Sequence, residues 1–427
     1  MIIVVLLCVL AVLMLALGFE MLLVMGLPSV LNKILLYPDM PSVAIAQRLL
    51  GGVEVVTLLA IPFFIFAADL MARGRMAQQL ADLFRTLFGG YRGGIGHSTV
   101  AAVMVFGAAA GSAPATVAAM GRLSYPELKR AGFSDRFSLG LIASSAETAL
   151  LIPPSITFVV YAWLTGTSIA ALFAAGLVVG IVLGLAFMVL VAWEAQRRGL
   201  SGGAASGAAL RWRALREAVW ALGMQVIILA GIFAGIFTAT EAAAVSAAYA
   251  ILVEVLVLRS LTWRDVFNIA QESALSTSVI FVLLAVGSLL AYFITLGNLQ
   301  GTLTQLIEQW NVGWVGYLLA VNVLFLIAGM FIDANSIMLI FLPTLFPIAA
   351  ALGIDPVHFG MVVTLNICIG MITPPFGLDL FVASSTLRRP VEDVVAGVWP
   401  FIWVNIAVLL LISYIPAIST ALPKVLL

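Results

Sequence analysis

Two groups of small polar residues interrupt a chain that is otherwise strongly apolar. Apart from Ala113, which offers only its backbone oxygen, their side chains offer hydroxyl, amide and carboxylate oxygens, which are hard ligands suited to an alkali cation and unsuited to a transition metal. Each group joins a short polar turn to a helical stretch further along the chain. The first group is Ser112, Ala113 and Thr116 with Ser144, Ser145 and Thr148; the second is Asp333, Asn335 and Ser336 with Asn366, Thr373 and Asp379. The sequence therefore predicts two cation sites.

Prolines interrupt the helical stretch of both groups. The pairs Pro153-Pro154 and Pro374-Pro375 lie inside apolar segments, 221 residues apart. Because proline lacks an N–H and clashes with the preceding turn, each pair must kink or end a helix. In a membrane the freed backbone groups need partners, and equivalent breaks in two halves point to the binding site of a transporter. We assign the helix breaks of a substrate site to Pro114, Pro153, Pro154, Pro374, Pro375 and Gly377.

The same offset relates further residues, so the chain contains an internal repeat. It carries Gly132 onto Gly353, Pro126 onto Pro347 and Glu20 onto Glu241. We expect a first repeat over residues 1–200 and a second over 211–427, joined by a small-residue linker near 199–210.

Composition places the chain in the membrane. Hydrophobic residues make up 63% and charged residues 9% of 427 residues, and the mean hydropathy is +1.19, whereas soluble domains carry about 25% charged residues. The balance of 20 basic and 20 acidic residues argues against nucleic acid as a partner. No histidine cluster of metal-site spacing, no phosphate-binding P-loop and no convincing nucleophile–base pair is evident, so we expect no enzyme and no cofactor.

Apolar stretches long enough to cross a bilayer predict an all-α polytopic protein. Amphipathic stretches at 76–88 and 299–310 are expected to lie along the membrane surface. The expected membrane helices are 1–17, 19–37, 51–72, 136–165 (interrupted), 169–194, 218–237, 240–258, 273–296, 357–386 (interrupted) and 397–422.

Two further stretches, 97–121 and 313–347, are typical of re-entrant hairpins. The legs of the first are expected to reach only about 20 Å, which is short of a hydrocarbon core of about 30 Å. The second has longer legs, and hydropathy alone leaves open two full spans there. Either alternative returns the chain to the side from which it entered.

Each half then makes five crossings, so about ten full crossings plus two hairpins are expected, with the second half inverted relative to the first. With the N-terminus outside, 17 of the 20 basic residues fall in inner loops, and only Lys33, Arg48 and Lys424 lie outside. The excess of inner positive charge supports this topology.

The chain resembles the large membrane subunit of tripartite ATP-independent periplasmic (TRAP) transporters over essentially its whole length. The most specific segments are GSAPATVAAMG (111–121), SSAETALLIPPS (144–155), GIFTATEAAAVSAAYA (235–250) and GMITPPFGLDLFVASS (370–385). At Asp379 the resemblance leads us to expect an amide, and the added carboxylate is expected to alter cation or substrate selectivity.

The resemblance implies a cation-driven importer, typically coupled to Na⁺, of organic acids such as C4-dicarboxylates, sugar acids or sialic acids. It implies two partners in the bacterial inner membrane and periplasm: a small four-helix membrane subunit and a soluble periplasmic substrate-binding protein. No four-helix block precedes Met1, so the small subunit is expected to be a separate chain, and the N-terminus is expected on the periplasmic side.

Several polar residues have a structural alternative to ligand binding. Ser and Thr in membrane helices commonly hydrogen-bond their own helix. Glu147 is expected to pair structurally with a basic group or backbone amides, whereas Asp333 fits either a ligand or a structural role. Glu20 and Glu241 are expected to complement the positive ends of helix dipoles.

Because all the polar helix breaks lie in two windows, we expect a fixed scaffold (1–72 and 218–296) and a mobile transport core (97–165 and 313–386) that moves as an elevator. Two alternatives remain at this point. One is a stand-alone sodium–dicarboxylate carrier with the same plan, and the other is a channel or structural membrane component.

Overall fold

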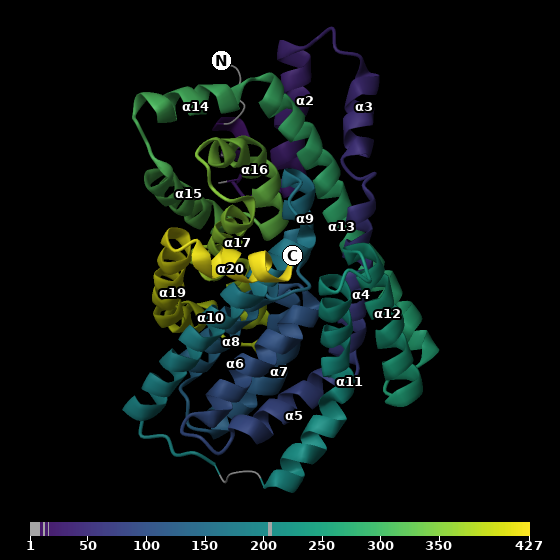
Figure 1. The fold of residues 1–427 in the computed structure, drawn as a ribbon, viewed down its shortest axis with the longest axis vertical. Coiled ribbons are helices and arrows are strands. Elements are labelled where there is room, and N and C mark those ends of the chain that lie inside the picture. The colour runs from purple at the N-terminus through teal and green to yellow at the C-terminus, as the bar shows by residue number, and fades with distance from the viewer. Residues whose placement is uncertain (1–8, 12, 16, 204–206) are drawn as a thin grey trace.

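The computed structural model describes residues 9–11, 13–15, 17–203 and 207–427, and every regular element within them is helical (Figure 1). The helix expected over 1–17 falls partly outside the described residues. In the first half the elements are α2 Met21–Leu36, α3 Ser42–Gly51, η1 Val56–Leu59, α4 Ala60–Arg73, α5 Met76–Phe88, α6 Gly94–Ala110, α7 Ala113–Arg130, α8 Asp135–Ala146, η2 Glu147–Leu150, α9 Ile156–Thr165 and α10 Ile169–Arg197.

The second half begins with the long helix α11 and ends with α20. Its elements are α11 Ala208–Phe233, α12 Ala239–Ile251, η3 Leu252–Val257, α13 Trp263–Leu296, α14 Leu299–Gln309, α15 Trp314–Gly329, α16 Ala334–Ala351, α17 Pro356–Ile372, α18 Leu378–Leu387, α19 Val391–Tyr414 and α20 Ala417–Leu426.

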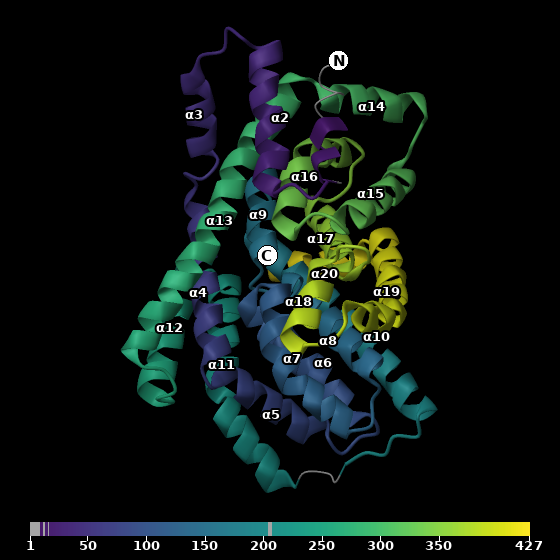
Figure 2. The same cartoon turned by 180° about the vertical axis from the view of Figure 1, so that it is seen from behind.

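The helices form two layers that lie side by side (Figures 1 and 2). One layer is built around α13, which packs on α2, α3 and α4, while α12 packs on α4 and α11. The other layer holds α6 to α10 and α15 to α20, where the closest pairs include α8 with α19 and α15 with α17. The layers meet where α13 packs on α16 and where α4 packs on α6.

Helix bounds follow the sequence offset closely. Helix α7 and helix α16 both contain 18 residues, and their first residues, Ala113 and Ala334, are 221 positions apart. Helices α8 and α17 also begin 221 positions apart, at Asp135 and Pro356. The contacts exchange in the same way, because α7 packs on α18 while α16 packs on α9. In each half, the helix that follows the polar turn thus packs against the broken helix of the other half.

The structure corrects several expected lengths. The legs of the first hairpin contain 17 and 18 residues, about 26 and 27 Å, because α7 continues past the apolar stretch into charged residues as far as Arg130. The legs of the second contain 16 and 18 residues, so they are not longer than those of the first. Helix α3 was not anticipated, and α11 and α13 begin ten residues earlier than expected, at Ala208 and Trp263.

Within the described residues, seven helices are long and apolar enough to cross a membrane. They are η1 with α4, α10, α11, α12 with η3, α13, α16 and α19, and their bounds are Val56–Arg73, Ile169–Arg197, Ala208–Phe233, Ala239–Val257, Trp263–Leu296, Ala334–Ala351 and Val391–Tyr414. Other apolar helices, among them α6, α15 and α17, are shorter. The two amphipathic stretches form helices, α5 over Met76–Phe88 as expected and α14 over Leu299–Gln309, one residue shorter than expected.

Candidate functional site

The first polar turn lies against the first helix break. Gly111 ends α6 with a left-handed backbone (φ 59°), and a Cβ atom there would lie 3.1 Å from the carbonyl oxygen of Pro154. One turn earlier, a Cβ atom at Gly107 would lie 2.9 Å from the Cβ atom of Ala149. Glycine is therefore needed both for the turn and for the close approach of the backbones. The hairpin tip and the broken helix form one contiguous region.

The predicted ligands of this first region are uncharged, and all of them except the half-buried Ser112 are buried. The hydroxyl groups of Ser144 and Ser145 are buried and have no hydrogen-bond partner. Thr148 donates to the carbonyl oxygen of Ser145 (2.7 Å), and Thr116 donates to that of Ser112 (2.8 Å). The two threonines thus bond their own helices, while the two serines leave oxygen atoms free.

The second turn lies against the second break in the same manner. A Cβ atom at Gly370 would lie 2.6 Å from the Cα atom of Gly329, so the ends of α15 and α17 touch through their backbones. The rings of Phe331 and Phe376 have centroids 5.6 Å apart, one beside the turn and one beside the Pro-Pro pair. Each half therefore brings its own turn to its own break.

The second region also contains unpartnered oxygens. Asn335 Oδ1, Ser336 Oγ and Asn366 Oδ1 are buried atoms without a hydrogen-bond partner. Thr373 instead donates to the carbonyl oxygen of Ile369 at 2.5 Å. Asp333 caps α16, because its Oδ2 accepts from the backbone N–H groups of Asn335 (3.1 Å) and Ser336 (3.2 Å). Helix capping thus accounts for one carboxylate oxygen of Asp333.

The two halves meet at a pair of buried acids. Glu147 is fully buried, and its Oε1 accepts a hydrogen bond from Asn405 Nδ2 at 2.6 Å, while Oε2 has no partner. Asp379 is also fully buried with neither oxygen bonded, and it lies within electrostatic range of Glu147. Cys368, which is 221 residues after Glu147, donates to the carbonyl oxygen of Glu147 (3.4 Å).

The surroundings of Glu147 and Asp379 differ from what the sequence suggested. Glu147 was expected to meet a basic group or backbone amides, and it bonds the side-chain amide of Asn405 instead. Asp379 was grouped with the second turn, and its helix α18 packs mainly on α7, α8, α17 and α19. Asn405 was missed because nothing in the sequence of α19 marks it as facing Glu147, which lies 258 residues away.

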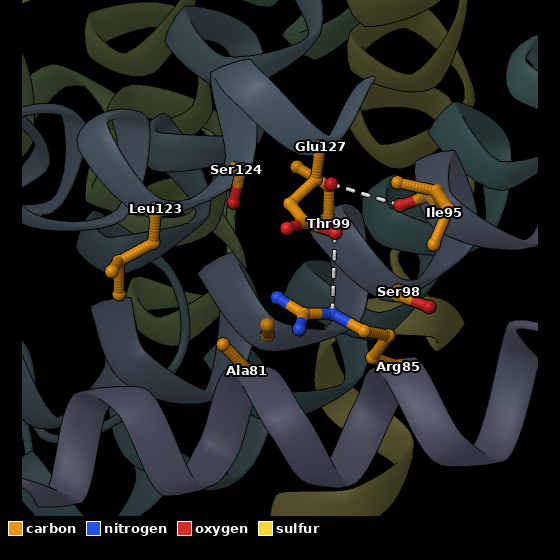
Figure 3. Close-up of a pocket in the computed structure, with 9 residues that line it drawn as sticks. Ala81, Arg85, Ile95, Ser98, Thr99, Leu123, Ser124 and Glu127 are labelled. Carbon is orange, nitrogen blue, oxygen red and sulfur yellow. Dashed lines mark hydrogen bonds and ion pairs between the residues drawn. The ribbon is translucent and has the colours of Figure 1, made fainter. Parts of the chain in front are cut away.

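A small cavity lies at the other end of the first hairpin, between α5, α6 and α7 (Figure 3). Its volume of about 20 Å³ is the size of a water molecule rather than of an organic acid. Arg85 of α5 points across it toward Glu127 of α7, with Nε and Oε2 3.6 Å apart (Figure 3). This polar contact connects α5 to α7.

An exposed ion pair fixes the chain between the first hairpin and the first broken helix. Lys129 Nζ lies 2.8 Å from Asp135 Oδ1, and the hydroxyl group of Tyr125 donates to the same oxygen at 2.6 Å. The ammonium group of Lys129, followed by the Tyr125 hydroxyl, lowers the pKa of the Asp135 carboxyl below its ordinary value. Asp135 is therefore a structural contact rather than a candidate ligand.

The donor set fits an alkali cation. Six of the residues predicted as ligands carry buried oxygens without a partner, and they are distributed over both groups: Ser144, Ser145, Asn335, Ser336, Asn366 and Asp379. A buried polar atom without a partner is costly, and hard oxygens would bind Na⁺ favourably. In the described part of the chain no three His, Cys, Asp or Glu side chains are grouped as a metal site would require.

Comparison with known proteins identifies the family. Residues 7–418 match the family model described as tripartite ATP-independent periplasmic transporter, DctM component. The chain is 37% identical over 407 residues to the ectoine TRAP transporter large permease protein TeaC of Halomonas elongata, and the match covers 95% of each chain. It is 38% identical to the C4-dicarboxylate TRAP transporter large permease protein DctM of Pseudomonas aeruginosa, with 94% of this chain and 93% of that protein covered.

A third relative and a solved structure extend the comparison. The sialic acid TRAP transporter large permease protein SiaM of Vibrio cholerae is 34% identical, and 89% of each chain is covered. In fold, the chain is similar to the YdaH transporter of Alcanivorax borkumensis, with a TM-score of 0.62, 13% identity, and coverage of 88% of this chain and 87% of that one. The chain therefore belongs to the DctM family, the large permease components of TRAP transporters.

Proposed function

We propose that this chain imports an organic acid across the bacterial inner membrane by Na⁺-coupled secondary transport. The observation that carries the proposal is the set of buried oxygens without partners at both turn–break regions. Na⁺ would be the missing partner of these oxygens. One ion would be held by Ser144 and Ser145, and another by Asn335, Ser336 and Asn366. The substrate carboxylate would bind near the helix N-termini at the breaks, where backbone N–H groups are free.

Inverted repeats and re-entrant hairpins are part of this proposal. The matching bounds of α7 and α16, and the exchanged contacts of α7 with α18 and α16 with α9, support two structurally equivalent halves. The inner excess of basic residues supports opposite orientations in the membrane, with the N-terminus on the periplasmic side. Ion and substrate sites would then lie at mid-membrane, between the halves.

The chain would work with two partners, a small membrane subunit and a periplasmic substrate-binding protein. Relatives of 34–38% identity are named for ectoine, C4-dicarboxylates and sialic acid. Similar identity to such different permeases supports a division of labour in which the binding protein selects the substrate. This chain would bind a feature that the substrates share, such as a carboxylate.

Uptake measurements test the proposal directly. The chain, its small subunit and its binding protein are reconstituted in liposomes, and uptake of a labelled dicarboxylate, sialic acid and ectoine is followed with Na⁺ or K⁺ outside. We expect uptake only with an inward Na⁺ gradient and only with all components. Uptake by the chain alone would favour a stand-alone carrier, and uptake without any cation gradient would contradict secondary transport.

We further propose that a core of 97–165 and 313–386 moves against a scaffold of 1–72 and 218–296. Helix α13 of the scaffold contacts α16 of the core, and a Cβ atom at Gly287 would lie 2.9 Å from that of Leu339. Cysteines at these two positions, in a background without Cys8 and Cys368, can therefore be cross-linked. The cross-link should stop uptake, and reduction should restore it.

A second cysteine pair provides the matched control. A Cβ atom at Gly26 would lie 3.5 Å from Val286 Cγ1, and both residues belong to the proposed scaffold. Cross-linking cysteines at 26 and 286 should leave uptake unchanged. If the chain cross-linked between 287 and 339 still transports, the proposed division into scaffold and moving core is wrong.

A further inference from the structure

The carboxamide of Asn366 is held in one orientation by its neighbours. Its Nδ2 donates to Asn322 Oδ1 at 2.7 Å and to the carbonyl oxygen of Val362 at 2.8 Å. These two bonds use both hydrogens of the amide group. Its Oδ1 is fully buried and has no partner. A reversed amide would place its nitrogen where the free oxygen lies and would set its oxygen against two acceptors.

Asn322 is itself held from the other side. Its Nδ2 donates to Ser413 Oγ of α19 at 3.0 Å, which leaves its Oδ1 directed at Asn366 of α17. Asn322 is 3% exposed, and Ser413 and Asn366 are fully buried. The series continues to His358, whose Nε2 lies 3.3 Å from the carbonyl oxygen of Ser413. Three helices therefore determine which end of the Asn366 amide is free.

The free oxygen belongs to the second turn–break region. A Cβ atom at Gly329, the last residue of α15, would lie 3.8 Å from the backbone oxygen of Asn366 and 3.0 Å from Gly370. Helix α17, which carries Asn366, also packs on α16, where Asn335 and Ser336 have buried oxygens without partners. An oxygen fixed in position by bonds to its own amide nitrogen binds a cation without first having to be ordered.

We propose that Asn322 is a positioning residue for the second cation site: it fixes the Asn366 carboxamide so that Oδ1 faces the coupling cation. Asn322 does not bind the ion itself. This inference rests on the proposed Na⁺-coupled function and adds a residue that the sequence did not indicate. Bonds of this kind to a ligand's second polar atom commonly change metal affinity by tenfold or more when removed.

The first half lacks an equivalent arrangement. The offset of 221 residues carries Asn322 onto Ala101 and Asn366 onto Ser145. An alanine side chain cannot accept a hydrogen bond, and the hydroxyl group of Ser145 has no partner. The first site therefore provides no comparable control of ligand orientation, so a defect caused by losing Asn322 should concern the second site alone.

The competing explanation is that Asn322 only joins α15, α17 and α19 as a buried polar contact. A double-mutant cycle separates the two roles. If Asn322 acts through Asn366, replacing it in a chain that already carries Asn366→Ala should add nothing to the loss of Na⁺ affinity. If its role is only to hold the helices together, replacing Asn322 should lower stability and leave the Na⁺ affinity of either background unaltered.

The test uses Asn322→Leu, which keeps the number and branching of the side-chain heavy atoms and removes both hydrogen bonds, in the reconstituted complex. We expect the Na⁺ concentration for half-maximal uptake to rise about tenfold, with uptake at saturating Na⁺ largely retained. Na⁺ should also raise the melting temperature of the purified complex, and the Na⁺ concentration needed for this rise should increase by the same factor. Ser246→Ala, which removes a buried hydroxyl of the proposed scaffold, should change neither measurement.

Ser413→Ala is the second variant, because it releases Asn322 without altering it. It should shift the Na⁺ dependence in the same direction by a smaller factor, and it keeps the test decisive if Asn322→Leu fails to assemble. The inference is overturned if neither variant shifts the Na⁺ dependence, or if Asn322→Leu and Asn366→Ala have additive effects. A wild-type complex without Na⁺ dependence would instead overturn the proposed function itself.

Discussion

The two turn–break regions share a helical plan and differ in chemistry and exposure. Around the first break, residues 151–160 are all buried, and the free oxygens nearby are the hydroxyls of Ser144 and Ser145 and Oε2 of Glu147, whose other oxygen is bonded to Asn405. At the second break Pro375 is exposed and Phe376 is 59% exposed, while its turn carries the carboxylate of Asp333. The backbone plan is thus repeated, and the side chains are not.

This difference bears on the two proposed cation sites, which would then bind their ions with unequal strength. The prolines and glycines place the breaks, so both halves present free backbone groups at matching positions. The electrostatic strength of each site then depends on side chains that are free to differ. In a low-dielectric interior a carboxylate attracts a cation more than a hydroxyl does. We therefore expect the second site to bind its cation more tightly than the first.

The largest expected effect comes from the contact between α15 and α17. Gly370→Ala should abolish most uptake, because its Cβ atom would lie 2.6 Å from the backbone of Gly329 and the overlap cannot be relieved by a side-chain rotation. The equivalent residue of the first half is already alanine, Ala149. Uptake by the reconstituted complex measures the effect, and Ala149→Gly is the matched control that should retain most activity. Normal uptake by Gly370→Ala would show that the second hairpin need not dock so closely.

The next largest effects concern charge. Asp379→Asn should raise the Na⁺ requirement for uptake by more than tenfold, because a buried charge about 4 Å from a cation contributes about 4 kcal/mol at an effective dielectric of 20. Asp333→Asn should have a smaller effect, since asparagine retains the helix cap. Ser112→Ala and Ser145→Ala should change the requirement only a few-fold.

The measurement is uptake against Na⁺ concentration, after each variant is shown to assemble. If Asp333→Asn and Asp379→Asn leave the Na⁺ dependence unchanged while Ser145→Ala weakens it, the order of the two sites is reversed. An unchanged Na⁺ dependence in Asp333→Asn alone would assign Asp333 to helix capping only.

Local signals in the sequence predicted much of this architecture. The Pro-Pro pairs located both breaks, and the amphipathic pattern gave α5 with its observed bounds, Met76–Phe88. These features depend on a residue and its near neighbours, which a sequence displays. Helix α3 was missed because a helix of 10 residues is too short to give the signal of a membrane span.

Contacts between distant helices could not be predicted in this way. Asn405 reaches Glu147 across 258 residues, and Asn322 reaches Asn366 from another helix. Each is an ordinary polar residue in an apolar helix, and only packing shows which neighbour it faces. The sequence located the candidate ligands, while the residues that hold them depend on tertiary structure.

A third prediction concerns the residue that holds the start of α5, which also differs between the halves. Glu254, fully buried in η3 directly after α12, accepts hydrogen bonds from the backbone N–H groups of Arg75 (3.0 Å) and Met76 (3.0 Å) at the start of α5. The equivalent residue of the first half is Lys33, which cannot accept such bonds. Glu254→Ala should lower the melting temperature of the complex by several degrees, because two N–H groups lose their charged acceptor.

Lys33→Ala is the matched control, and it should change the melting temperature little. An equal decrease in both variants would mean that Glu254 does not anchor α5 specifically. Na⁺ dependence should be the same in both variants, because neither residue belongs to a turn–break region.

The smallest expected effect lies at Asp135, whose equivalent in the second half is Pro356. Lys129 and Tyr125 lower the pKa of Asp135, so its ionised form is favoured in the folded chain. Its contribution to stability is therefore present above the ordinary pKa of 3.8 and is lost as the pH falls through the lower folded value. Because the ion pair is exposed, Asp135→Asn should lower the melting temperature at pH 7 by only about 1 °C. The difference from wild type should stay constant between pH 6 and 8, decrease below pH 3.8 and disappear once the pH is below the lowered folded pKa. A difference that grew as the pH fell would contradict the stabilising role of the ionised carboxylate and would leave the connection between α7 and α8 dependent on apolar packing.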